Sequence, residues 1–207
     1  MDKRGSIALL FLIVIFAIQG VEGMNVIDIT NATLYANISI DEFSSKDKFA
    51  FSTWIKQGNM AEEYNFIIGI YRQDKSWYEN SGLTLTQHSK GGLRLVALFG
   101  NGSERYDHIM VGILPDTWNH IGVIFNGSQL DYILNGQVKR TFYTNNKTMN
   151  VSNGDYKIKM NKAAGNQTRF ISETAFWFGG TVPNREELGQ YARGEVSIPG
   201  GYNRYYN

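Results

Sequence analysis

The chain has 207 residues, of which 43% are hydrophobic, so it can bury one sizeable core and we expect a single globular domain. Its 20 basic and 19 acidic residues give a formal net charge of +1 without a long run of either sign, which argues against a nucleic-acid partner. Cysteine is absent, which excludes disulfides, thiolate metal sites and cysteine nucleophiles.

Residues 1–23 have the organisation of a targeting segment. The basic stretch MDKRG precedes the uncharged apolar run SIALLFLIVIFAI, and QGVEG follows with small residues where a signal peptidase cleaves. We therefore expect a cleaved secretory signal and a mature chain that begins near Met24. The run is shorter than the roughly 20 residues that cross a bilayer, so an uncleaved membrane anchor is the weaker alternative. A third alternative is cleavage after Gly5, as in archaeal type IV pilin-like leaders, which leaves the apolar segment on the protein.

Residues 24–195 have the pattern of an all-β domain. Short runs rich in aromatic and β-branched residues alternate with clusters of Gly, Asn, Asp and Ser, as in a jelly-roll sandwich of two antiparallel sheets. The predicted strands are Val26–Ile29, Thr33–Ile40, Phe49–Lys56, Asn65–Arg72, Gly82–Gln87, Leu93–Phe99, Tyr106–Val111, His120–Phe125, Asp131–Leu134, Lys139–Tyr143, Tyr156–Met160 and Ser172–Phe178. Three tryptophans in these patterns are expected in the core: Trp54, Trp118 and Trp177.

The stretch from Trp118 to Tyr143 predicts a β-meander. Apolar residues alternate from Ile121 to Phe125 with the period of a strand that has one face on a core. The dipeptide Asn-Gly follows at Asn126 and again at Asn135, and it tolerates the positive φ that primed hairpin turns require. We expect a tight hairpin at each dipeptide.

Only PNREELGQYAR, residues 183–193, has helical character. Proline stands at an early position, acidic residues follow in the first turn, and an arginine stands at the end. Residues 196–207 are expected to form a C-terminal tail, and the last eight of them are polar and tyrosine-rich without a period.

Three segments together resemble the concanavalin A-like lectin and glucanase superfamily, and in particular its laminin G-like jelly-roll domains. They are FAFSTWIKQ at 49–57, DTWNHIGVIFNGSQLDYILNGQV at 116–138 and ISETAFWFGGTVPNREELGQYA at 171–192. The resemblance covers about residues 25–193 and implies two antiparallel sheets, one of them concave. Members of this superfamily mostly bind carbohydrate or protein outside cells, and some are glycoside hydrolases.

The acidic residues do not match the hydrolases of this fold. Those enzymes use a Glu-x-Asp-x-x-Glu pattern, which places two carboxylates about 5 Å apart on one strand face. Here the nearest acids, at 41–42 and 62–63, are adjacent and would point to opposite faces of a strand. The histidines, His88, His108 and His120, are scattered, and His120 is interpreted as part of the scaffold. We predict no catalytic residue.

Some relatives of this fold hold calcium in loops at the rim of the sandwich. Ser172 and Glu173 stand where many members carry two acids, so we predict no metal site. No motif indicates a cofactor.

The loop RQDKSWYENSG, residues 72–82, contains the candidate sugar site. A sugar needs an aromatic face for its apolar side and amide or carboxylate groups for its hydroxyls. Trp77 and Tyr78 supply the aromatic faces, and Asp74 and Asn80 supply polar groups, with Glu79 beside them. In the alternative, Trp77 folds back to cap the core.

Seven asparagines lie in Asn-X-Ser/Thr sequons, against about two or three expected by chance. The excess predicts N-linked glycans, although Asn-Gly-Ser is also good turn chemistry, which is the alternative. The seven are Asn31, Asn37, Asn101, Asn126, Asn146, Asn150 and Asn166.

These patterns together predict an exported, N-glycosylated, non-catalytic module for recognition or adhesion outside the cell or at its surface. Its expected partner is an extracellular glycan or a cell-surface protein. A membrane is contacted only through an uncleaved N-terminal segment. The alternative is a structural surface protein, such as a pilin-like or envelope subunit, whose sandwich makes protein contacts.

Overall fold

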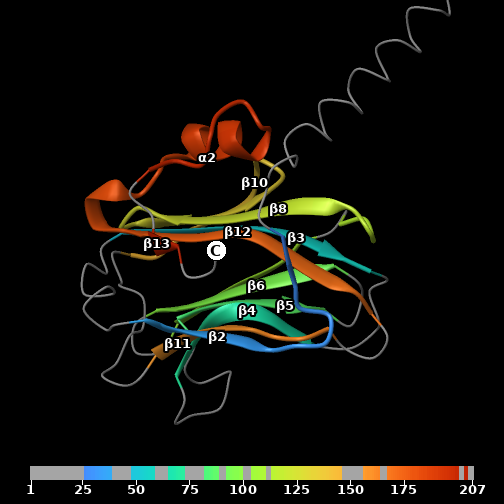
Figure 1. The fold of residues 1–207 in the computed structure, drawn as a ribbon. Coiled ribbons are helices and arrows are strands. Elements are labelled where there is room, and N and C mark those ends of the chain that lie inside the picture. The colour runs from blue at the N-terminus through green and yellow to red at the C-terminus, as the bar shows by residue number, and fades with distance from the viewer. Residues whose placement is uncertain are drawn as a thin grey trace, which may run out of the picture.

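A computed structural model describes residues 26–38, 48–58, 65–72, 82–88, 92–99, 104–110, 113–145, 156–163, 167–200 and 203–204. Over these residues the chain forms two stacked antiparallel sheets with one α-helix outside the larger sheet (Figure 1). The predicted all-β sandwich is therefore confirmed. The expected N-terminal hydrophobic helix lies outside the described residues. Within those residues, no helix is long and apolar enough to cross a membrane.

Each sheet combines a run of consecutive strands with strands that are distant in sequence. The larger sheet has the order β1 (Val26–Asp28), β12 (Arg169–Phe178), β3 (Phe49–Gln57), β8 (Trp118–Phe125), β9 (Gln129–Leu134) and β10 (Gln137–Tyr143), and β13 (Asn203–Arg204) pairs with β12. The smaller sheet has the order β2 (Leu34–Ile38), β11 (Tyr156–Met160), β4 (Asn65–Arg72), β5 (Leu83–Gln87), β6 (Leu93–Phe99) and β7 (Glu104–Met110). All twelve predicted strands are present, with bounds that differ by a few residues.

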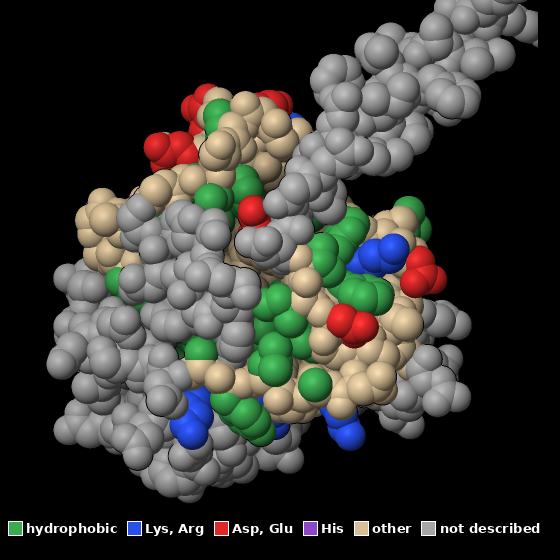
Figure 2. All heavy atoms as spheres, in the orientation of Figure 1, with side chains coloured by type: hydrophobic (Ala, Val, Ile, Leu, Met, Phe, Trp, Pro, Cys, Tyr) green, Lys and Arg blue, Asp and Glu red, His purple; other side chains and the backbone are tan. Residues whose placement is uncertain are grey.

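The main core lies between the two sheets. Side chains from β3, β8, β9 and β12 pack against side chains from β4, β5 and β6. Phe125 links the layers, because its ring lies 5.5 Å from Phe49 and 4.9 Å from Phe99. The predicted alternation along β8 is confirmed, since Ile121, Val123 and Phe125 all belong to this core. Hydrophobic side chains also reach the surface between the layers (Figure 2).

A second apolar cluster covers the outer face of the larger sheet. It is held by the helix α2 (Arg185–Ala192), whose Leu188 is fully buried against the strands. A Cβ added at Gly122 would lie 2.9 Å from Leu188 Cδ2, so the small residue in β8 lets the helix approach closely. The expectation that β8 has only one buried face is therefore wrong, because both its faces are covered. The cluster contains Ala50, Trp54, Ile124, Ile133, Ala175, Trp177, Leu188 and Tyr191, with Trp118 partly buried against it.

The helix begins with a capping box. The side chain of Asn184 accepts hydrogen bonds from the backbone N–H groups of Glu186 and Glu187, and Glu187 accepts from the backbone of Asn184. The predicted helix is therefore confirmed, with Pro183 just before the cap. Acidic side chains lie over α2 (Figure 2), and two of the chain's acids, Glu186 and Glu187, stand in its first turn, near the positive end of the helix dipole.

The C-terminal tail has more structure than its sequence predicted. The strand β13 pairs with β12 through Ala175 and Phe176. Trp177 Nε1 donates to the carbonyl oxygens of Pro199 and Gly200 at 3.2 and 3.0 Å. A buried indole donor in β12 therefore fixes the chain that follows α2.

The two Asn-Gly turns differ in detail. Asn135 and Gly136 both have positive φ, 50° and 75°, so the predicted primed turn between β9 and β10 is confirmed. Between β8 and β9 the connection has three residues, and of its Asn-Gly pair only Gly127 has positive φ, 102°. There the Asn126 side chain closes the turn, because its Oδ1 accepts from the backbone N–H of Gln129 at 2.8 Å.

Candidate functional site

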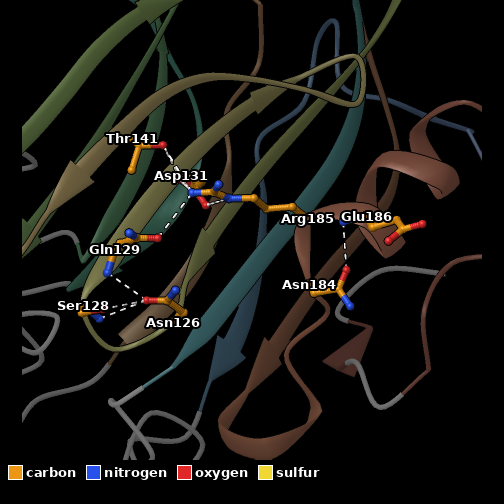
Figure 3. A network of polar contacts seen from close by, with 8 residues as sticks. All are labelled: Asn126, Ser128, Gln129, Asp131, Thr141, Asn184, Arg185 and Glu186. Carbon is orange, nitrogen blue, oxygen red and sulfur yellow. Dashed lines mark hydrogen bonds and ion pairs between the residues drawn. The ribbon is translucent and has the colours of Figure 1, made fainter.

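A polar surface lies where the first turn of α2 meets strands β9 and β10 (Figure 3). Strand pairing places Tyr143 opposite Gln129 and Thr141 opposite Asp131. Arg185, the first residue of α2, reaches down to these strands. We call these five residues the β9–β10–α2 surface.

Arg185 is held in place by a buried carboxylate. The Asp131 side chain is only 3% exposed, whereas that of Arg185 is 49% exposed. Arg185 Nη2 donates to Asp131 Oδ1 at 2.7 Å, and its Nε pairs with Oδ2. Thr141 Oγ1 donates to the same carboxylate at 2.6 Å. These hydrogen bonds raise the pKa of Arg185 above its usual value, so the exposed guanidinium is a permanent and well-oriented cation.

The surface around Arg185 offers an aromatic ring and an amide. Tyr143 is 69% exposed, and its hydroxyl is near enough to Arg185 to contribute to the raised pKa, after Asp131. Gln129 Oε1 accepts from Arg185 Nη2 at 3.5 Å. Among the described contacts of Arg185, none uses Nη1, so its two N–H groups can donate to a ligand. A ring, a cation and an amide together suit a ligand that carries hydroxyl or carboxylate groups.

One of the predicted glycan acceptors borders this surface. Asn126 is exposed, and its Oδ1 is used by the turn, with hydrogen bonds from the backbone N–H groups of Ser128 and Gln129. The backbone N–H of Thr144 donates to Ser128 O at 2.9 Å, which joins this turn to the end of β10. The side-chain nitrogen of Asn126 is the atom to which an N-linked glycan would attach. A second acceptor, Asn31, is exposed just after β1.

The other predicted site residues are not described by the structure. Asp74, Trp77, Tyr78 and Asn80, together with Glu79, lie outside the described residues, so the sugar-binding loop stays a prediction. The remaining acceptors also stay predictions, because the side chain of Asn37 and the whole of Asn101, Asn146, Asn150 and Asn166 are not described.

Sequence reasoning missed the β9–β10–α2 surface. Asp131 was considered only as the polar member of an alternation, and Arg185 only as part of a helix, 54 residues further along the chain. The available signal was an acidic side chain within an otherwise apolar strand, because a buried carboxylate requires a partner. That signal does not say which of the chain's basic residues is the partner.

A serine–histidine pair exists but is sealed inside the molecule. Ser52 Oγ lies 2.8 Å from His120 Nε2, and both residues are fully buried beneath α2. The imidazole packs against Trp54 and Tyr191, and the Tyr191 hydroxyl donates to Glu173 at 2.5 Å. Burial lowers the pKa of His120 to about 3, so the ring is neutral. The geometry places His120 in the scaffold, as the sequence predicted.

The described residues contain no group of three His, Asp or Glu side chains that could hold a metal ion. Glu173 adopts a positive φ of 47° at an irregularity in β12, and its carboxylate accepts from Tyr191. This acid therefore serves the contact between β12 and α2.

Comparisons with known proteins identify structures of similar fold but do not assign the chain to a family. No protein-family model matches the chain, and no curated protein matches it. Among solved structures, the receptor-binding domain of the botulinum neurotoxin C/D mosaic serotype is similar, with a TM-score of 0.64, 14% identity, and coverage of 83% of this chain and 43% of that one.

Two further similar structures were determined with ligands. The serotype D ligand-binding domain in complex with N-acetylneuraminic acid has a TM-score of 0.62 and 13% identity, over 84% of this chain and 45% of that one. The neurotoxin DC binding domain in complex with rat synaptotagmin II has a TM-score of 0.58 and 13% identity, over 84% of this chain and 47% of that one.

This chain spans less than half the length of these toxin domains. At such low identity the likeness establishes a shared β-sandwich fold and nothing finer.

Proposed function

We propose that this chain is an exported, N-glycosylated, non-catalytic module that binds an extracellular carbohydrate or a cell-surface protein. We further propose that it belongs with the concanavalin A-like and laminin G-like sandwiches, with residues 24–195 as the binding domain. The observation that carries the proposal is the β9–β10–α2 surface. There an Arg185 guanidinium held by buried Asp131 contacts Thr141, and the exposed Tyr143 follows two residues later on the same face of β10.

Preorganisation is the reason to assign binding to this surface. A free arginine side chain loses rotamer freedom when a ligand orders it, and this cost weakens binding. In Arg185 the rotamer is already set by two contacts to Asp131, and Nη1 is left for a ligand. Tyrosine adds a large rigid surface with only two rotatable angles. Two of the similar toxin domains were determined with a ligand, one with N-acetylneuraminic acid and one with rat synaptotagmin II, which supports a binding function for this chain.

A glycan array on the mature domain tests the proposal, with binding affinities measured for each ligand found. We expect Tyr143→Ala to weaken binding about tenfold, which corresponds to about 1.4 kcal/mol for a lost stacking contact. Tyr35→Ala is the matched control, because Tyr35 is 53% exposed but lies on the smaller sheet. An array without any ligand, together with measurable hydrolysis of a β-glucan, would contradict a binding module.

The loop around Trp77 is the second proposed ligand site, and Trp77→Ala tests it in the same assay. Loss of binding in Trp77→Ala with unchanged binding in Tyr143→Ala would assign recognition to the loop. The opposite pattern would assign it to the β9–β10–α2 surface.

Glycosylation is tested by the intact mass of the native protein. We expect a mass above that of the polypeptide by several glycans, with Asn101 and Asn126 among the occupied sites because exposed turns present the acceptor. Asn126→Gln should remove the mass of one glycan. A native mass equal to that of the bare chain would mean that the sequons reflect turn chemistry.

The alternative function is a structural surface subunit of the pilin-like or envelope kind. It rests on Lys3-Arg4-Gly5 before the apolar run, which resembles a pilin-like leader. N-terminal sequencing of the native protein separates the two proposals. A start at Ser6 supports the filament subunit, whereas a start near Met24 supports the secreted module.

A further inference from the structure

Among the residues whose side chains the structure describes, one arginine is fully buried, and it lies between the two sheets at the end of the sandwich where β3 ends and β12 begins. Arg169 pairs with Gln57 in the larger sheet and has no exposed surface. Its Nε donates to Gln57 Oε1 at 3.3 Å. Its Nη1 donates to the carbonyl oxygens of Phe66, Asn161 and Lys162 at 3.3, 2.9 and 3.2 Å. Because Phe66 belongs to β4, the guanidinium bridges both sheets.

No carboxylate of the described residues pairs with this cation. The ion pairs of the described chain are elsewhere, and they join Arg94 and Arg105 to Asp107, Arg185 to Asp131 and Arg193 to Glu195. Gln57, which accepts from Arg169, is uncharged, and its Nε2 donates to the amide oxygens of Gln87 and Gln167. Burial alone lowers the pKa of Arg169 to about 10, so the side chain stays protonated at neutral pH. Within the described part of the chain, the contacts of this positive charge are therefore to neutral dipoles.

The remaining nitrogen of Arg169 has no hydrogen-bond partner. Nη2 is buried and carries two N–H groups that no protein atom accepts. A buried donor without an acceptor is costly, and a buried charge without a counter-charge is costlier. A water molecule at Nη2 would accept from the donors but would leave the positive charge of the guanidinium without a counter-charge. A small anion would satisfy the donors and neutralise the charge.

We propose that Arg169 Nη2 forms a binding site for a small monovalent inorganic anion of the halide class, located between the sheets. Such an anion closes the end of the sandwich, because its counter-charge reaches the cation that holds β3, β4 and β12 together. This site is separate from the β9–β10–α2 surface and does not depend on the proposed binding function. Its role is to stabilise the native state, since a ligand that binds only the folded chain raises the stability with its concentration.

Thermal unfolding of the full chain at constant ionic strength tests the site, with chloride exchanged for the bulky anion isethionate. We expect each tenfold increase in chloride above the dissociation constant to raise the unfolding midpoint by about 3 to 5 °C. Arg140→Gln removes an exposed arginine from β10 and should keep the full chloride response. Arg169→Gln should lose it. The proposal would be overturned if the unfolding midpoint of the wild type did not change with chloride concentration. It would also be overturned if the midpoint of Arg169→Gln rose with chloride as much as that of the wild type.

A second measurement covers the case in which Arg169→Gln does not fold. Crystals of the wild-type protein grown in bromide should show an anomalous scattering peak at hydrogen-bond distance from Nη2. A water molecule at that position, without an anomalous peak for bromide, would overturn the proposal.

Discussion

Acid should destabilise this protein through the buried imidazole of His120. Burial lowers the pKa of His120 to about 3 in the folded chain, whereas an unfolded histidine titrates near about 6.5. Because the folded pKa is depressed, the unfolded chain takes up the proton first as the pH falls. The stabilising contribution of the neutral ring is therefore complete above pH ~6.5 and is lost progressively down to pH ~3.

The size of the effect follows from these two values. Between pH 7 and pH 5 the unfolded state gains about 2 kcal/mol relative to the folded state from this group alone. The contacts of His120 explain why the folded chain resists the proton, since the ring touches the Ser52 hydroxyl and the rings of Trp54 and Tyr191 and no carboxylate. Its Nδ1 is buried without a partner, so the protonated ring would carry a buried charge and an Nδ1–H that no atom accepts.

Urea unfolding at pH 7 and pH 5 measures this loss in free energy of unfolding. The wild type should lose about 2 kcal/mol more than His120→Gln, because carboxylates titrate alike in both proteins. His108→Gln is the control, since burial and Arg140 also lower the pKa of His108 but the residue is only partly buried. An equal pH dependence in wild type and His120→Gln would refute the reasoning.

Three further substitutions test the packing of α2 on the larger sheet. Gly136→Val should lower the free energy of unfolding in urea by about 2 to 4 kcal/mol, because φ is +75° and a Cβ would lie 3.0 Å from a helix carbonyl. The control Gly180→Val should change this free energy little, because the space around Gly180 is open. Leu188→Ala should cost about 2 to 5 kcal/mol, and a loss below 1 kcal/mol would mean that the helix is loosely attached. Tyr191→Phe removes a hydroxyl that accepts from an indole N–H and donates to a carboxylate, so thermal unfolding should show a loss of about 1 to 3 kcal/mol.

The sequence by itself determined the local elements of this protein. Alternation from Ile121 to Phe125 identified a core strand, because successive side chains of a strand point to opposite faces. Asn135 and the glycine after it identified a primed turn, because few other residues adopt positive φ at low cost. Acidic residues after Asn184 identified the start of a helix, because they cap it and interact with its dipole. Each of these signals involves residues a few positions apart.

Tertiary structure alone decided what those elements cover and which charges they bury. Alternation along β8 could not reveal that α2 buries its second face, because a helix and a sheet meet through residues far apart in the chain. Asp131 and Arg185 meet only when the register of β9 and β10 is set and the helix docks. An arginine at the first position of a strand, as Arg169 is in β12, is typically an exposed charge. Here the two stacked sheets enclose it. Strand register and layer packing are long-range properties, so the candidate ligand surface and the anion site were decided by the fold.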